Sequence, residues 1–191
     1  MFLLGGGARA ESERNKIERG PLRISADETV SLERGKIIEA KGNVLVHYDM
    51  DSGDLISSES DFARYTEKGY EGEIWGHPRA WWFRKDPNNP KTTLTAERVH
   101  LDIKQSQLRA TGHVRVEQGS STLKAQEVVY DNEKKIITAT GKRPVFEIEQ
   151  KDQNTLISAE KIIALVNDKQ IRFTDRVKGR VLMSPENLEK N

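Results

Sequence analysis

The sequence repeats itself, and this repetition constrains the fold more than any other feature of the chain. Five segments share one layout. Each begins with an apolar residue, a small residue and an acidic or polar residue. Two stretches follow in which apolar and polar residues alternate, separated by a polar turn, and then a glycine precedes a further alternating stretch. The segments begin at Ile24, Ile56, Leu94, Leu123 and Ile157. Such periods are typical of stacked arrays, in which each unit packs on its neighbours. An enzyme with one active site has no need of this pattern.

The spacing between the small residue and the glycine is nearly constant. It is identical in four units: Ala26 to Gly42, Ala96 to Gly112, Ala125 to Gly141, and Ala159 to Asp175, where aspartate replaces glycine. In the second unit the spacing, from Ser58 to Gly76, is longer by two positions, which predicts a two-residue insertion there. Glycine inside a strand marks a bend or a bulge. The pattern therefore predicts one repeated kink, at which a strand bends from one sheet to the other.

The units alternate with the period of two that is typical of half-buried strands. Val114 and Val116, for example, alternate with His113, Arg115 and Glu117. Hydrophobic residues make up only 35% of the chain, and charged residues make up 32%, against an average of about 25%. A thick core is therefore not expected. The sequence predicts an all-β fold, either a flattened β-roll or an open jelly roll.

Composition excludes several function classes. The formal net charge of +1 argues against a polybasic nucleic-acid binder and against an acidic-tail protein. The chain has no cysteine, so a disulfide framework, a thiolate metal site and a thiol nucleophile are impossible. No apolar run reaches the ~18 residues that a transmembrane helix needs.

The two ends differ from the repeats. The apolar stretch 1–7 is followed by Ala8-Arg9-Ala10, which resembles the end of a secretory signal with its cleavage site. We assign residues 1–16 to a leader, which is either a truncated signal or a disordered segment. Residues 17–184 are expected to form a single domain, and residues 185–191 a polar tail.

Polar residues show no pattern that is typical of catalysis or metal binding. The four histidines lie in separate units, whereas a metal site needs three or four convergent ligands; they are His47, His77, His100 and His113. Acidic residues recur once per unit, with a glutamine in the fourth, and so predict a ladder rather than a catalytic pair; they are Asp27, Glu59, Glu97 and Glu160, with Gln126. We expect no enzyme activity, catalytic residue, metal or cofactor.

These motifs, in their order, resemble the LptA/OstA-like family of lipopolysaccharide transport proteins. The resemblance covers about residues 20–191. It is carried by Ile24-Ser25-Ala26-Asp27, Gly42-Asn43-Val44, Gly76-His77-Pro78 with Trp81-Trp82, Gly112-His113-Val114, Gly141-Lys142, Ala159-Glu160-Lys161-Ile162, Leu165-Val166, Lys178-Gly179-Arg180-Val181 and the tail Ser184-Pro185-Glu186-Asn187.

The resemblance implies both a fold and a function. The implied fold is a slightly twisted antiparallel β-jellyroll with an open, V-shaped section. The implied function is non-enzymatic: a periplasmic bridge of Gram-negative outer-membrane biogenesis that carries the acyl chains of lipid A, the lipid part of lipopolysaccharide, in an apolar groove. Its expected partners are an LptC-like inner-membrane protein, an LptD-like outer-membrane protein and further copies of the chain, stacked head to tail.

Strand alternation selects the residues that we expect to face the groove and bind lipid. Within the aromatic run 81–83 we place the first and third side chains inward and Trp82 outward. The full set is Leu22, Ile24, Val44, Val46, Trp81, Phe83, Leu101, Ile103, Val114, Val116, Tyr130, Phe146 and Ile148. The open strand edges expected to support stacking lie near Leu22–Asp27 and near Ile171–Met183.

Other functions remain possible from the sequence. The chain could be an LptC-like or LptD N-terminal-like component, although LptC would need a membrane anchor. A structural β-solenoid without lipid would show a tightly packed interior. A polysaccharide-acting enzyme would need convergent carboxylates, which the ladder does not supply.

Overall fold

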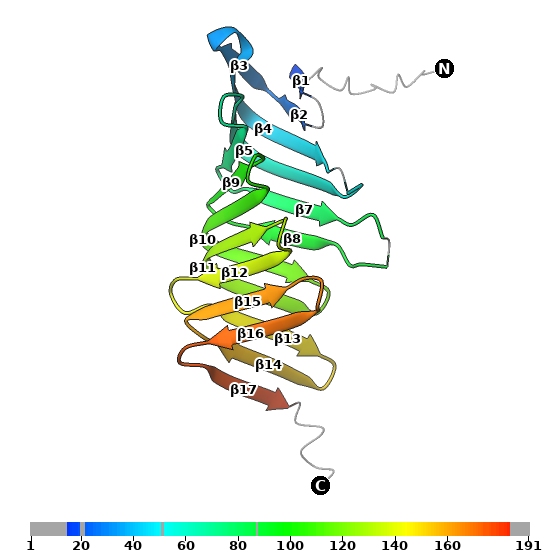
Figure 1. Ribbon diagram of the computed structural model, residues 1–191, viewed down its shortest axis with the longest axis vertical. Coiled ribbons are helices and arrows are strands. Elements are labelled where there is room, and N and C mark those ends of the chain that lie inside the picture. Colours follow the sequence, from blue (N-terminus) through cyan, green and yellow to red (C-terminus); the bar gives the residue numbers. More distant parts are fainter. Residues whose placement is uncertain (1–14, 20–21, 51, 87, 184–191) are drawn as a thin grey trace, which may run out of the picture.

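The computed structural model describes residues 15–19, 22–50, 52–86 and 88–183. The expected leader residues 1–14 and the expected tail 185–191 lie outside these ranges. The described chain forms seventeen antiparallel strands and a single 3-10 turn, Glu33–Gly35. The strands are stacked along the long axis, from β1 to β3 at one end to β16 and β17 at the other (Figure 1). The expected all-β jellyroll is confirmed.

The strands form one continuous hydrogen-bonded sheet that is folded into two layers. Layer A contains β3 (Glu28–Leu32), parts of β4 (Ile37–Asp49) and β5 (Leu55–Thr66), β6 (Glu71–Trp75), β9 (Arg98–Asp102), parts of β10 (Gln107–Gln118) and β11 (Ser121–Asp131), β12 (Ile136–Thr140), β15 (Lys161–Leu165) and β16 (Gln170–Thr174). Layer B contains β1 (Asn15–Arg19), β2 (Leu22–Ala26), the other parts of β4 and β5, β7 (Arg79–Phe83), β8 (Thr92–Thr95), the other parts of β10 and β11, β13 (Val145–Gln150), β14 (Gln153–Ser158) and β17 (Lys178–Met183).

The two layers are joined along one side of the molecule, where strands bend from one layer into the other; we call this side the spine. At each kink the backbone N–H of the acidic or polar residue donates to the carbonyl of the residue at the glycine position. The pairs are Asp27 with Gly42, Asp61 with Gly76, Glu97 with Gly112, Gln126 with Gly141 and Glu160 with Asp175, at 2.9–3.4 Å. The residue at the glycine position has φ between 62° and 77° in all five kinks, and the next residue is also in the left-handed region. The kink predicted from the glycine spacing is therefore present.

The second kink corrects the alignment of the second unit. The residue that bonds to Gly76 is Asp61, not Glu59, and the small residue before it is Ser60 rather than Ser58. The spacing from Ser60 to Gly76 equals the spacing from the small residue to the glycine position in the other four units. The two-residue insertion predicted for the second unit is therefore wrong. The sequence was ambiguous because Ser58-Glu59 and Ser60-Asp61 both combine a small residue with an acid.

Side chains add a second contact to most kinks. The Asn43 amide donates to Asp27 at 2.7 Å, and the His77 ring lies 3.1 Å from Asp61. His113 pairs with Glu97 and Arg176 pairs with Glu160 in the same way. These groups are exposed, and His77 is 96% exposed. The acidic ladder therefore lies on the outside of the spine, where it supports the bend.

The opposite side of the molecule, which we call the mouth, is lined by turns. In layer A each turn donates a backbone hydrogen bond to the previous one: Glu67 to Lys36, Ile103 to Tyr70, Asn132 to Ser106 and Val166 to Lys135. The layer B turns at the mouth include residues 52–54 and 84–86. Among the described strands, those that cross between the layers do so at the spine, so the mouth is closed only by side chains.

The apolar core lies between the layers. In the N-terminal half, Ile38 of layer A and Val44 of layer B are almost completely buried, with 1% and 0% of their surface exposed. Further along the chain, Val114 and Ile162 are each 1% exposed. Within the described ranges, no helix is long and apolar enough to cross a membrane.

The strand edges at the N-terminal end differ from the expectation. β1 pairs with β2 along its length, so the segment near Leu22–Asp27 is covered in layer B. Residues 15 and 16, which we assigned to the leader, belong to this strand. Among the described residues the open N-terminal edges are therefore β1 in layer B and β3 in layer A. At the C-terminal end, β16 and β17 are the outermost strands, as expected.

A glycine substitution tests the kink. Gly76→Ala is expected to lower the free energy of unfolding by about 1–3 kcal/mol, because a side chain at this φ is strained. The added Cβ would also lie 2.6 Å from the Cβ of Asp61. Urea unfolding measures the effect. Gly179→Ala is the matched control, since nothing lies within 4 Å of its added Cβ; it is expected to change stability by less than about 0.5 kcal/mol. Equal effects of the two substitutions would contradict this account.

Candidate functional site

Two adjacent cavities lie between the layers, with volumes of about 120 and 70 Å³. The smaller cavity extends toward β2, and the larger lies near β7, β8 and β11. Six residues line both of them: Tyr48, Ile56, Ala80, Leu101, Ile103 and Leu108. The shared lining is almost entirely apolar, so the interior suits an apolar ligand.

The structure places the thirteen expected groove residues in three surroundings. Eight line one of the cavities: Leu22, Ile24, Val46, Trp81, Leu101, Ile103, Val116 and Tyr130. Four belong to the packed core or lie against it: Val44, Val114, Phe146 and Ile148. Phe83 is 41% exposed. Lipid binding by this set stays a prediction.

The aromatic run on β7 has the opposite phase to the one expected. Ala80 is buried, and Trp82 contacts Tyr130 inside, with ring centroids 4.9 Å apart. Trp81 borders the larger cavity, but its ring lies 5.4 Å from the Arg79 guanidinium and 5.9 Å from Lys91 Nζ. Because neighbouring residues in a strand point to opposite faces, Trp82 shares the inner face with Ala80, and the outward placement of Trp82 is wrong. Trp81 still borders the larger cavity, whereas Phe83 is not among its lining residues.

Several cavity residues were missed from the sequence. Tyr48 and Leu108 lie on strands whose alternation of apolar and polar residues is visible in the sequence. Tyr48 lies two residues after the inward Val46, and Leu108 lies two residues before the inward Ala110. A longer alternation count would have found both. Ile56 and Trp82 face each other across β5 and β7, and only this pairing reveals their phase.

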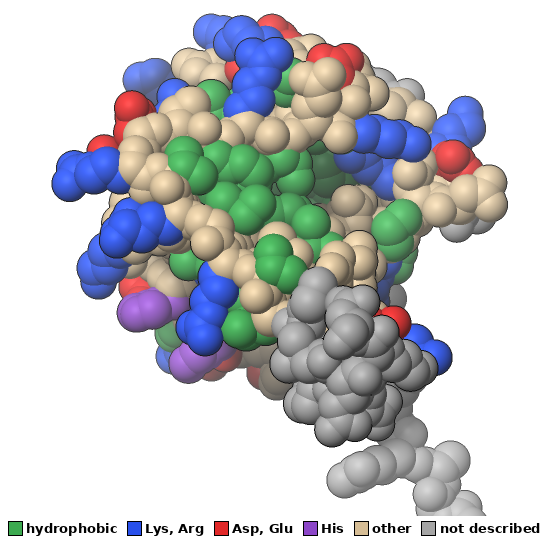
Figure 2. Space-filling view, turned by 90° about the horizontal axis from the view of Figure 1, so that it is seen from below, with side chains coloured by type: hydrophobic (Ala, Val, Ile, Leu, Met, Phe, Trp, Pro, Cys, Tyr) green, Lys and Arg blue, Asp and Glu red, His purple; other side chains and the backbone are tan. Residues whose placement is uncertain are grey.

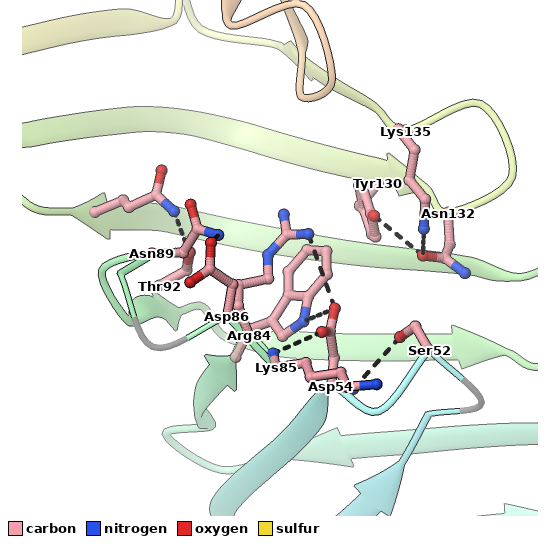
Figure 3. Close-up of polar contacts among 12 residues, drawn as sticks. Ser52, Asp54, Arg84, Lys85, Asp86, Asn89, Thr92, Tyr130, Asn132 and Lys135 are labelled. Atoms are coloured by element: carbon pink, nitrogen blue, oxygen red, sulfur yellow. Dashed lines mark hydrogen bonds and ion pairs between the residues drawn. The ribbon is translucent and has the colours of Figure 1, made fainter.

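Trp82 and Tyr130 meet across the mouth, since Trp82 lies near the mouth end of β7 in layer B and Tyr130 near that of β11 in layer A. We call this contact the aromatic clasp. Two polar residues, Asp54 and Arg84, which Figure 3 labels, hold Trp82 in place. Its Nε1 donates to Asp54 at 3.1 Å, and the Arg84 guanidinium lies 3.7 Å from its ring centroid. The clasp therefore closes the middle of the mouth over the larger cavity.

The Tyr130 side of the clasp is also fixed. The Tyr130 hydroxyl donates to Asn132 Oδ1 at 3.1 Å, and Lys135 Nζ donates to the same oxygen at 2.7 Å. Burial raises the pKa of Tyr130 to about 12, while the nearby Arg84 charge acts in the opposite direction. The phenol therefore stays neutral at physiological pH and lies in an environment that disfavours charge.

The interior also reaches the C-terminal end of the molecule. Figure 2, viewed from that end, shows hydrophobic side chains gathered around a hollow and surrounded by Lys and Arg. Exposed apolar residues on the last two strands are Ile171, Val181 and Leu182. Between this end and the cavities, Phe146 and Phe173 pack together with ring centroids 6.1 Å apart. The apolar interior thus continues to the last strands, partly filled by side chains.

The described residues contain no group of three or more His, Asp or Glu side chains that could hold a metal ion. The acidic ladder lies on the outer spine, and its carboxylates pair with Asn, His or Arg rather than with each other.

Comparisons with known proteins agree with this architecture. Residues 93–181 match the family model described as "LptA/(LptD N-terminal domain) LPS transport protein". Among curated protein sequences, none matches the chain. The fold resembles the crystal structure of LptH, "the LptA homologous periplasmic component of the conserved lipopolysaccharide transport device from Pseudomonas aeruginosa", with a TM-score of 0.52 and 15% identity. This likeness covers 86% of the chain and 96% of LptH.

The fold and its interior define an open antiparallel β-jellyroll with an apolar core between two layers. Residues 93–181 match the model of that transport family, and the fold of the described chain is similar to that of LptH.

A pH titration tests the burial of Tyr130. A raised pKa in the folded state contributes stability that is fully present below the unfolded value of 10.0 and is lost as the pH rises toward about 12. The free energy of unfolding should therefore fall between pH 10 and 12, and Tyr130→Phe should remove that part of the decrease. Tyr70→Phe is the control, because Tyr70 is 54% exposed. An identical pH dependence of wild type and Tyr130→Phe would contradict the assignment.

Proposed function

We propose that this protein is a non-enzymatic component of lipopolysaccharide transport that holds the acyl chains of lipid A between its two layers. The observation that carries the proposal is the apolar cavity inside a jellyroll whose central and C-terminal part matches a lipopolysaccharide transport family. The periplasm is the proposed location, by analogy with LptH.

Burial of acyl chains supplies the binding energy. Removing one methylene from water is worth about 0.8 kcal/mol, so even a partly buried chain gains useful affinity. The inner surface is apolar from Leu22 and Ile24 at one end to Val181 at the other. A ligand therefore meets similar surroundings along the molecule, and its movement needs no hydrolysis by this chain.

The open strand edges support a bridging role. β16 and β17 at one end, and β1 and β3 at the other, are outermost among the described strands. An unpaired edge accepts a further strand, and a head-to-tail contact of this kind forms open chains. We propose that copies stack in this way, and that the ends dock an LptC-like inner-membrane protein and an LptD-like outer-membrane protein.

The rival functions fit less well. The cavity distinguishes the chain from a structural solenoid with a filled interior, and the outward, paired acids do not form a glycosidase site. The matched family model also describes the N-terminal domain of LptD, so a role as an LptD-like module is the second candidate.

Purification from a host that contains lipopolysaccharide tests the proposal. Mass spectrometry of the purified protein should detect co-purified lipid A species. Leu101→Glu should greatly reduce the bound lipid, because it places a carboxylate in the lining of both cavities.

The control for this experiment is His100→Glu, the neighbouring position on β9, which faces away from the cavities. It should retain lipid. Both variants should first be shown to keep the far-UV circular dichroism of wild type. A wild-type protein without bound lipid, or equal loss in both variants, would contradict the proposal.

Sedimentation tests the stacking. Wild type should self-associate as its concentration rises, and a chain truncated after Thr174 should not, because β17 is then absent. A wild type that stays monomeric and binds no OstA-like partner would contradict the bridging role. Unchanged association of the truncated chain would show that β17 is not the contact edge.

A further inference from the structure

Two cationic side chains flank the aromatic clasp, one from each layer, beside the larger cavity that the clasp borders. Arg84 follows β7 in layer B, and Lys135 precedes β12 in layer A. Arg84 lies against Trp82, and Lys135 shares Asn132 with Tyr130; Arg84 and Lys135 are labelled in Figure 3. Cavity and cations thus lie next to each other, as an amphiphile with a charged head group would require.

The layer B side is held rigidly before any ligand binds. The Asp54 carboxylate accepts from Trp82 Nε1 at 3.1 Å and from the backbone N–H of Lys85 at 2.9 Å, and it lies 3.8 Å from the Arg84 guanidinium. The side chains of Arg84 and Asp54 are only 21% and 12% exposed. Fixed donors lose little conformational entropy on binding. Asp54 also offsets part of the Arg84 charge, which makes Arg84 the weaker of the two cations.

Lys135 on the layer A side is not compensated by a carboxylate in the described part of the chain. Its Nζ donates to the neutral Asn132, at 2.7 Å, whereas the neighbouring Lys134 pairs with the Asp131 carboxylate. Asn132 Oδ1 accepts from both Lys135 and Tyr130, so the amide N–H groups of Asn132 remain as donors. Tyr130 is 9% exposed, and its surroundings strengthen electrostatic interactions at this point.

Other turns of layer A also carry a lysine at the mouth, for example Lys104 and Lys169. Neither takes part in the aromatic clasp or in its polar contacts. The combination of an uncompensated cation, an amide donor and a second cation across the mouth occurs at Lys135, Asn132 and Arg84. A tetrahedral anion with several acceptor oxygens can accept hydrogen bonds from donors of this kind.

We propose that Lys135, Asn132 and Arg84 form a site for the phosphate group of an amphiphile whose chains occupy the larger cavity. The site rests on the proposed function, because it requires a lipid in that cavity. It adds specificity: the clasp region distinguishes phosphorylated from neutral amphiphiles by their head group. Movement along the interior would then be slowest at this position, where chains and head group are both bound.

Calorimetric titration with three probes tests the site: dihexanoyl phosphatidic acid, dihexanoylglycerol and inorganic phosphate. Wild type should bind the phosphatidic acid about tenfold more tightly than the neutral lipid, as expected for one charge-assisted contact. Lys135→Gln should abolish most of this preference and leave the affinity for dihexanoylglycerol unchanged. Arg84→Gln should have a smaller effect in the same direction. Lys169→Gln, on the next layer A turn, is the matched control and should behave as wild type.

The outcomes separate this site from the proposed function. Equal binding of both lipids to wild type would overturn the phosphate site and leave the proposed function intact. Inorganic phosphate that binds as tightly as the phosphatidic acid would show a site for free anions and overturn the head-group assignment. If Lys135→Gln and Lys169→Gln lose the preference for phosphatidic acid equally, the preference arises from the overall positive charge and not from this site. That result also overturns the proposed phosphate site. No binding of either lipid would contradict the proposed function, and the site with it.

Discussion

The spine kink is the interaction on which the rest of the structure depends. One backbone hydrogen bond, from the residue at the acidic position to the carbonyl at the glycine position, recurs at each of the five kinks. Left-handed backbone at this position turns a long strand such as β4 or β10 out of layer A and into layer B. Because both layers share these strands, the molecule is tied together at the spine and needs no continuous backbone pairing at the mouth. The apolar interior is therefore bounded at the mouth by side chains alone, including the aromatic clasp over the larger cavity.

The kink also explains which parts of the fold could be predicted from the sequence. Glycine at a constant spacing located the kink at Gly42, Gly112 and Gly141, and the alternation of β10 placed Val114 and Val116 on the inner face. The second unit failed because two small-acidic pairs compete there, and the chain alone does not show which one bonds to Gly76. β1 was missed because Asn15–Arg19 contains a single apolar residue, and its place in the sheet depends on pairing with β2.

The candidate site was predicted only in part, for a similar reason. Leu101 and Ile103 follow a clear alternation and line both cavities. The run 81–83 has no polar residue to set its phase, so the direction of Trp82 depends on the pairing of Ala80 with Ser58 and Leu94. The clasp joins Trp82 and Tyr130, which are far apart in the sequence and lie in different units. No local pattern predicts such a contact.

The central claim is that lipid lies between the two layers, and site-specific photo-cross-linking in a lipopolysaccharide-containing host tests it most directly. Leu108 and Arg109 are adjacent on β10; Leu108 lines both cavities, whereas Arg109 is exposed. A photoreactive amino acid at position 108 should cross-link to lipopolysaccharide, and the same amino acid at position 109 should not. Cross-linking at 109 alone, or equally at both positions, would contradict the account.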